Sequence, residues 1–228
     1  MSARITGISS MATRALLADL AQAYERQTGI AVAIEAVGGV DAARRVQAGE
    51  AFDAVFLASD AIDRLIASGH VSGARTDLVR SPVAIAVRHG AVRPDVSTEP
   101  ALKAAVLAAP RISYSTGPSG VHLQKLFERW GIADEIAPRT VQAPPGVPVG
   151  SLVARGEVDL GFQQLSELMN LPDVDVIGGL PGDTQFITIF SAGVCAQSTQ
   201  VAAVRALLSF MTSPQVAESK RRHGMEPV

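Results

Sequence analysis

The chain has 228 residues, of which 47% are hydrophobic and 18% charged, and its formal net charge at pH 7 is −2. This length and composition suit one large domain or two smaller lobes, with enough apolar residues for well-formed cores. No stretch is strongly basic, so we expect neither nucleic acid nor an anionic membrane as a partner. The single cysteine, Cys195, excludes a disulfide within the chain and disfavours a metal cluster, and we expect it in the core.

The sequence contains no candidate membrane span. No segment approaches the roughly 20 consecutive apolar residues that a membrane-spanning helix requires. The N-terminus passes from Met1 to a predicted strand at Ile5 without the apolar stretch of a signal peptide. We expect a cytoplasmic protein if Met1 is the native start, and a periplasmic one if a leader was removed.

Strand-like and helix-like segments alternate along the first third of the chain. This alternation predicts an α/β fold with mostly parallel sheets flanked by helices. Glycines follow the predicted helices, as is typical of helix ends. The elements expected here are a strand at 5–8, a helix at 10–27, a strand at 30–37, a helix at 41–47, a strand at 54–57 and a helix at 60–68.

The composition changes at Ser81-Pro82, and residues 83–87 are predicted to form a strand that leaves the first lobe. A long β-rich segment, 183–195, is expected to cross back. Between them we expect a helix at 99–109, a strand at 111–115, a helix at 120–130, a helix at 149–155, a strand at 158–162 and a helix at 165–169. The predicted lobes are residues 1–81 with 188–228, and residues 82–187, with a hinge and a ligand cleft between them.

Four loops rich in glycine or serine lie between a predicted strand and the next helix. They cover residues 7–10, 37–40, 115–120 and 143–147. In open α/β sheets, ligands bind beyond the carboxyl ends of the strands, where such loops meet helix N-termini. Glycine allows close approach of the backbone, N–H groups at helix starts favour an anion, and serine hydroxyls add uncharged donors. The loops therefore predict a site for an oxyanion or a carboxylate.

Several motifs occur in an order that resembles the periplasmic molybdate-binding proteins. They are the opening strand with Ser9-Ser10, the runs 41–53 and 60–69, the loop Gly117-Pro118-Ser119-Gly120 and the C-terminal Ser213-Pro214-Gln215. The chain is similar to that family over almost its whole length, within the wider superfamily of solute-binding proteins of ABC transporters. The resemblance implies a two-lobed, type II periplasmic-binding fold that closes around a small anionic ligand, an ABC transporter permease as partner, no cofactor and a monomeric state.

The resemblance also implies ligand-binding positions. The positions carried over, with their neighbours in the same loops, are Ser9, Ser10, Gly38, Gly39, Val40, Thr116, Ser119, Gly120, Val121, Gly146, Val147 and Gln164. The molybdate binders have a serine in the second loop and a tyrosine at the position of Gln164, and this chain has neither hydroxyl. The absence of these two hydroxyls argues against molybdate or tungstate. The side-chain amides of Gln163 and Gln164 suit a carboxylate or a hydroxylated organic acid better than a bare tetrahedral oxyanion.

Three hypotheses for the function follow. The first is a non-enzymatic solute-binding protein for a small anion. The second is a cofactor-independent isomerase of an unsaturated polycarboxylate, because aconitate isomerase is similar to the molybdate-binding family; His122, Glu167 and Ser10 would carry the proton. The third is an intracellular ligand sensor, although no helix-turn-helix precedes residue 5. The sequence shows no metal-ligand spacing.

Overall fold

The computed structural model describes residues 4–144 and 146–228. The chain divides into two compact units: unit 1 takes the chain up to Arg80 and again from Ile189 to Val228, and unit 2 is Ser81–Thr188. Two strands, β4 (Val71–Arg88) and β9 (Ile187–Cys195), begin in one unit and end in the other. Each unit has its own hydrophobic core.

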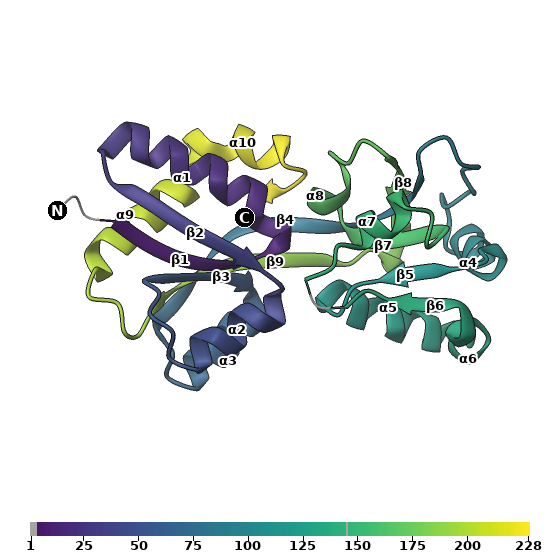
Figure 1. The fold of residues 1–228 in the computed structure, drawn as a ribbon, viewed down its shortest axis with the longest axis horizontal. Coiled ribbons are helices and arrows are strands. Elements are labelled where there is room, and N and C mark those ends of the chain that lie inside the picture. The colour runs from purple at the N-terminus through teal and green to yellow at the C-terminus, as the bar shows by residue number, and fades with distance from the viewer. Residues whose placement is uncertain (1–3, 145) are drawn as a thin grey trace. The chain divides into compact units, whose positions relative to one another are not determined.

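Unit 1 is an α/β fold, with one β-sheet that carries helices on both faces (Figure 1). Strands β2, β1 and β3 are parallel, and β9 pairs with β3 in the antiparallel direction. The strands are β1 (Arg4–Ser10), β2 (Ala31–Val37), β3 (Ala54–Ala58) and the short C-terminal β10 (Glu226–Pro227), which pairs with β4. The helices are α1 (Arg14–Thr28), α2 (Gly39–Gln47), α3 (Ser59–Ala67), α9 (Val201–Thr212) and α10 (Ala217–Arg222).

The side-chain alternation of the strands assigns these helices to faces. Ile5 and Ile8 lie three residues apart on β1 and therefore point to opposite sides of the sheet. Ile5 packs in one cluster with residues of α1 and α9, and Ile8 packs in another with residues of α2 and α3. Figure 1 shows α1 above the strands, and α2 and α3 below them. Cys195 lies in the second cluster, where burial raises the pKa of its thiol to about 12.

A buried carboxylate links two segments of unit 1 that are distant in the sequence. Asp53 accepts hydrogen bonds from the N–H and the hydroxyl of Thr6, both at 2.9 Å, and from the hydroxyl of Ser198 at 2.7 Å. The amide of Gln200 adds a fourth donor at 3.1 Å. Burial raises the pKa of Asp53, but these donors outweigh it, so the net shift is downward. The carboxylate therefore joins β1 to the segment that leads into α9.

Unit 2 repeats the layered plan with its own sheet. Its strands are the second half of β4, β5 (Ile112–Tyr114), β6 (Thr140–Gln142), β7 (Leu160–Gln164) and β8 (Val174–Gly179). Strands β6, β5 and β7 are parallel, whereas β7 and β8 both pair with β4 in the antiparallel direction. The helices are α4 (Glu99–Ala108), α5 (Pro118–Arg129), α6 (Ala133–Ile136), α7 (Val149–Ala154) and α8 (Leu165–Leu168).

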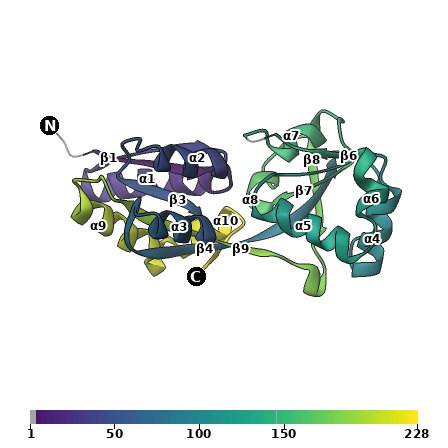
Figure 2. The same cartoon turned by 90° about the horizontal axis from the view of Figure 1, so that it is seen from below.

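Two apolar clusters cover the faces of this second sheet. One joins α4, α5 and α6 to the sheet through residues such as Leu102, Leu126 and Phe162, and the other joins α7 and α8 to it through Val153 and Leu168. Figure 2 shows α5 and α7 on either side of β7. The α/β class expected from the sequence is confirmed for the described residues.

Some elements differ from the sequence prediction. β4 begins at Val71 rather than at residue 83, because its first half carries exposed polar residues and a glycine instead of an apolar pattern. The strands β6 and β8 and the helix α6 were not predicted, since each is short and half exposed. None of the helices in the described part of the chain is both long and apolar enough to cross a membrane.

Candidate functional site

In unit 1, the ends of three neighbouring parallel strands lead directly into helical turns. β1 is followed by a 3-10 turn, Met11–Thr13, while β2 and β3 are followed by α2 and α3. β1 lies between β2 and β3, and Ser10 is in register with Val37. The starts of these helices therefore gather at one edge of the sheet, around the end of β1.

Ser10 carries the most unusual polar atom at this edge. The residue is only 8% exposed, and its Oγ has no hydrogen-bond partner among residues 4–144 and 146–228. A Cβ on Gly39 would lie 3.6 Å from the Cβ of Ser10, so the first residue of α2 packs directly beside this hydroxyl. A buried hydroxyl without a partner costs about 1–3 kcal/mol, so such an atom in a native protein calls for an explanation.

The start of α2 adds backbone donors beside Ser10. The first hydrogen bond of this helix runs from the Ala42 N–H to the Gly38 carbonyl at 2.9 Å. The N–H groups of Gly39 and Val40 precede it and lack an acceptor within the helix. Val40 exposes 58% of its surface. This edge thus combines a free hydroxyl, helix-start amides and an exposed apolar side chain.

The charged residues of α2 are paired with one another or with their neighbours. Arg44 contacts Asp41 at 2.7 Å, and Arg45 contacts both Glu35 and Glu50. Hydrogen bonds to Glu50 and Glu35 raise the pKa of Arg45 further above its usual range. These guanidinium groups stabilise the surface around α2, while the donors beside Ser10 are electrically neutral.

Ser9 has a different environment from its neighbour. It is fully buried, and its hydroxyl donates to the Glu35 carbonyl of β2 at 3.4 Å. Successive residues of a strand point to opposite faces, so only one of the two serines can present its hydroxyl beside α2. Of the serine pair expected from the sequence, Ser10 is the one with a free hydroxyl.

In unit 2, a second set of donors lies at the start of α5. The first helical bond joins the Val121 N–H to the Gly117 carbonyl at 3.1 Å, so the N–H groups of Ser119 and Gly120 lack helical acceptors. Ser119 is 2% exposed, and its Oγ lies 3.3 Å from the Oγ of Ser115. Thr116 lies half-buried in the same loop.

The first turn of α5 has a strict requirement for glycine at one position. A Cβ on Gly120 would lie 1.7 Å from the Ser115 carbonyl oxygen, far inside contact distance. The Ser115 hydroxyl also accepts a hydrogen bond from the Gly117 N–H at 3.3 Å. Ser115, which the sequence did not single out as a site residue, therefore shapes the loop. Val121 exposes 47% of its surface at this helix start, as Val40 does at the other.

His122 is held on α5 by residues distant in the sequence. Its Nε2 lies 2.9 Å from the Thr184 carbonyl oxygen. Its ring stacks on Phe186 at 4.7 Å between centroids, with 15° between the planes. His122 was a candidate from its place in the sequence, whereas Phe186 and Thr184 were not, because no local pattern links residues about sixty positions apart.

The loop before α7 uses its donors internally. The Val147 N–H donates to the Pro144 carbonyl at 3.0 Å, and Gly146 is exposed with φ of +80°. Pro145 lies outside the described residues. The Gly150 N–H donates to Oε1 of buried Gln163 at 3.0 Å, and Gln163 donates to Glu167 at 2.7 Å. Glu167 thus belongs to a network that connects α7 and α8.

Gln164 is also engaged within unit 2. It is 4% exposed and pairs with Val83 in the sheet. In the amide orientation that satisfies both of its polar atoms, Nε2 donates to the hydroxyl of Ser81 at 2.8 Å and Oε1 accepts from the Thr188 hydroxyl at 2.8 Å. In this structure the amide therefore connects β7 to Ser81 and Thr188, the first and last residues of unit 2. The ligand contact expected for Gln164 stays a prediction.

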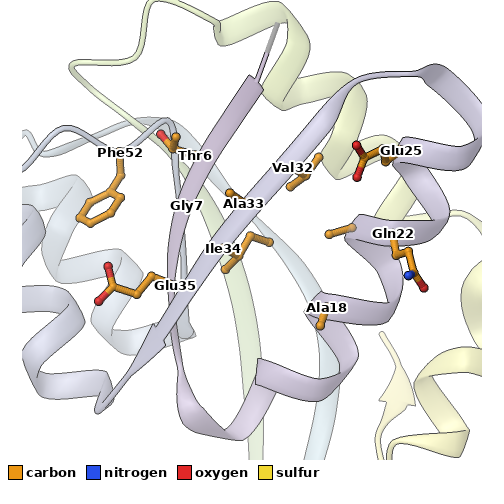
Figure 3. Close-up of a pocket in the computed structure, with 11 residues that line it drawn as sticks. Thr6, Gly7, Ala18, Gln22, Glu25, Val32, Ala33, Ile34, Glu35 and Phe52 are labelled. Carbon is orange, nitrogen blue, oxygen red and sulfur yellow. The ribbon is translucent and has the colours of Figure 1, made fainter. Parts of the chain in front are cut away.

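A surface groove in unit 1 lies away from these donors. Figure 3 shows it along the edge strand β2, with Val32 and Ile34 on the side of α1 and Glu35 near Phe52 on the other. Its polar side chains include the carboxylates of Glu25 and Glu35, which would repel an anion. Throughout the described chain, no cluster of three or more His, Cys, Asp or Glu side chains could hold a metal ion.

Known proteins resemble this chain over nearly its full length. A family model described as bacterial extracellular solute-binding protein matches residues 5–226. A protein named aconitate isomerase from Pseudomonas sp is 37% identical, covering 98% of this chain and 88% of its own. The molybdate-binding protein ModA of Escherichia coli is 21% identical over 97% of this chain and 88% of its own.

Solved structures agree on the fold. The periplasmic molybdate-binding protein of Azotobacter vinelandii superposes with a TM-score of 0.81 at 19% identity, covering 97% of this chain and 98% of the other. The resemblance to the molybdate-binding proteins and the periplasmic-binding type of α/β fold are thereby confirmed. Because the family model matches almost all of its residues, this chain belongs to the bacterial extracellular solute-binding proteins.

Proposed function

We propose that this protein binds small organic anions with several carboxylates through neutral donors at helix starts, one set at α2 in unit 1 and one set at α5 in unit 2, each considered by itself. The observation that carries the proposal is the buried, unpartnered Oγ of Ser10 beside the free amides of Gly39 and Val40. A carboxylate accepts hydrogen bonds from several donors at once, and hydrogen bonds to a charged acceptor are about twice as strong as neutral ones. A bound carboxylate would supply the partner that Ser10 lacks.

The chemistry around the donors favours an organic acid over an inorganic oxyanion. Val40 and Val121 expose apolar side chains on the same helix turns that carry the free amides. Carbon atoms of a ligand at either helix start would gain from contact with the valine there, whereas the oxygens of molybdate or sulfate would lose hydration. The relative named aconitate isomerase, at 37% identity, supports a tricarboxylate as the ligand.

Binding can be tested by calorimetry with trans-aconitate, cis-aconitate, citrate, molybdate, tungstate and sulfate. We expect the carboxylates to bind and the Ser10→Ala variant to bind them at least about tenfold more weakly, which corresponds to about 1.4 kcal/mol. Ser113 offers a matched control, because its Oγ is also buried and unpartnered but lies within β5. Tight binding of molybdate with no response to carboxylates would refute the proposal.

Isomerisation of such an acid is a second candidate function. It is favoured by the 37% identity to the aconitate isomerase, which extends over 98% of this chain, far above the 21% identity to the molybdate-binding protein. Incubating the purified protein with trans-aconitate and following cis-aconitate by proton NMR tests it. Formation of the cis isomer would establish an isomerase. Binding without turnover would leave a solute-binding role, whose partner would be an ABC transporter permease.

A further inference from the structure

We propose that His122 transfers the proton in this isomerisation through its Nδ1 atom, and that the Thr184 carbonyl and the Phe186 ring position it for that step. The inference rests on the isomerase function proposed above. The contacts of His122 with Thr184 and Phe186, which are distant in the sequence, define which ring nitrogen can react.

The contact with Thr184 assigns the two ring nitrogens. A carbonyl oxygen only accepts hydrogen bonds, so Nε2, at 2.9 Å from it, must carry a proton. The basic lone pair of the neutral ring then lies on Nδ1, which has no partner among the residues that the structure describes. Nδ1 is therefore the atom that can take up and release a proton.

The acceptor of this hydrogen bond is itself fixed. Thr184 is fully buried, and its hydroxyl donates to the Pro181 carbonyl at 2.6 Å while its N–H donates to the same carbonyl at 3.1 Å. Because Thr184 is buried and makes two hydrogen bonds, it has little freedom to move. Its carbonyl therefore fixes the direction in which the Nε2–H of His122 points. The tautomer of His122 is thus set before any ligand arrives.

The plane of the imidazole is set by a second contact. Phe186 stacks on it with 15° between the planes. The backbone of Phe186 is held in turn, since its N–H donates to the Gln185 side chain at 2.9 Å and its carbonyl accepts from the Val83 N–H at 3.2 Å. With one nitrogen bonded and one face covered, the ring can neither flip nor tilt without breaking a contact.

His122 lies close to the donors of α5. It follows Ser119 by three residues, and side chains three apart on a helix are neighbours on its surface. His122 is half-buried, so its ring is not sealed within the core. A base and a set of neutral anion donors thus share one turn of α5.

This pairing suits an allylic proton shift. Aconitate has a CH2 group between a carboxylate and a carbon–carbon double bond. Nδ1 would take a proton from the CH2 as that C–H bond breaks, and the electron pair would spread over the allylic system and its carboxylates. Return of the same proton to the former vinylic carbon forms the new C–H bond and moves the double bond. No oxidant or reductant is needed, and His122 ends neutral.

The test replaces the base but keeps its hydrogen bond. In His122→Gln the amide can still donate to the Thr184 carbonyl but cannot accept a proton at neutral pH. We expect turnover of trans-aconitate to fall by about 10²-fold or more, the usual loss of a general base. The Kd for trans-aconitate should stay within about threefold, because the donors of Ser119 and Gly120 at the start of α5 remain.

Two further variants separate position from packing. Phe186→Leu keeps an apolar side chain but removes the stack, so we expect a lower kcat with an unchanged Kd. His89→Gln is the matched control, because His89 is also in unit 2 and bonds to Asp175 on the surface, and it should retain wild-type turnover. Circular dichroism would confirm that each variant is folded.

The outcomes distinguish the two proposals. If the wild type binds trans-aconitate but neither isomerises it nor exchanges its CH2 protons in D2O, the isomerase function fails, and this inference fails with it. If the wild type turns over and folded His122→Gln does so within threefold, only the role of His122 is overturned. Loss of turnover in His122→Gln with retained binding would support it.

Discussion

Replacing Ser10 by alanine should move stability and binding in opposite directions. In the unliganded protein the Ser10 hydroxyl is 8% exposed and has no hydrogen-bond partner in the described chain. Removing it takes away a buried group that costs about 1–3 kcal/mol when unsatisfied, at the loss of very little packing volume. The free energy of unfolding without ligand should therefore stay constant or rise.

Binding should respond in the other direction. A hydrogen bond to a charged acceptor contributes about 1.5–3 kcal/mol, and each 1.4 kcal/mol is a factor of ten in Kd. We expect Ser10→Ala to weaken carboxylate binding by about ten- to hundredfold. A structural serine would show the reverse pattern, with lower stability and unchanged affinity.

Two measurements on the same sample decide this. Thermal melting without ligand should give a Tm equal to or above that of the wild type, since about 1 kcal/mol shifts the Tm of a chain of this size by roughly 2–4 °C. Calorimetry with the tightest-binding carboxylate gives the affinity. Ser113→Ala should share the stability effect and leave Kd unchanged. A Tm loss of several degrees in Ser10→Ala with wild-type Kd would refute the reasoning.

Three other predictions concern stability. Asp53→Ala should lower the free energy of unfolding by on the order of 2–3 kcal/mol, because its donors lose a charged acceptor. The folded pKa of Asp53 lies below its unfolded value, so its contribution should be present above about pH 4 and vanish as acid titrates the folded carboxylate, which urea melts from pH 3 to 7 would detect. Gly120→Ala should destabilise by about 3 kcal/mol or more, because its Cβ would overlap the Ser115 carbonyl, while Gly117→Ala, whose Cβ would meet only the Ser115 Oγ at 3.6 Å, should cost far less in the same denaturation assay. Burial lowers the pKa of Lys220, so the unfolded chain binds more protons in alkaline solution and stability should rise with pH towards about 10.5; Lys220→Met should lack that rise in urea melts.

The sequence by itself indicated the fold class and the loops that carry donors. Alternating strand and helix segments, with glycine at the helix ends, predicted the α/β architecture because each element obeys a local pattern. The first helix illustrates this, since Gly29 ends it with φ of +73°. The order of the short motifs also predicted the solute-binding family, which the family match confirms. The binding roles assigned to individual residues stay predictions.

Only the tertiary structure decided what each polar side chain in those loops contacts. Ser9 and Ser10 are adjacent in the sequence, yet one bonds to Glu35 of β2 and the other has no partner in the described residues. Gln164 bonds to Thr188, and His122 to the Thr184 carbonyl, across separations of 24 and 62 residues. The availability of a donor depends on which distant atoms fill its hydrogen-bonding positions, and packing, not local pattern, determines those neighbours.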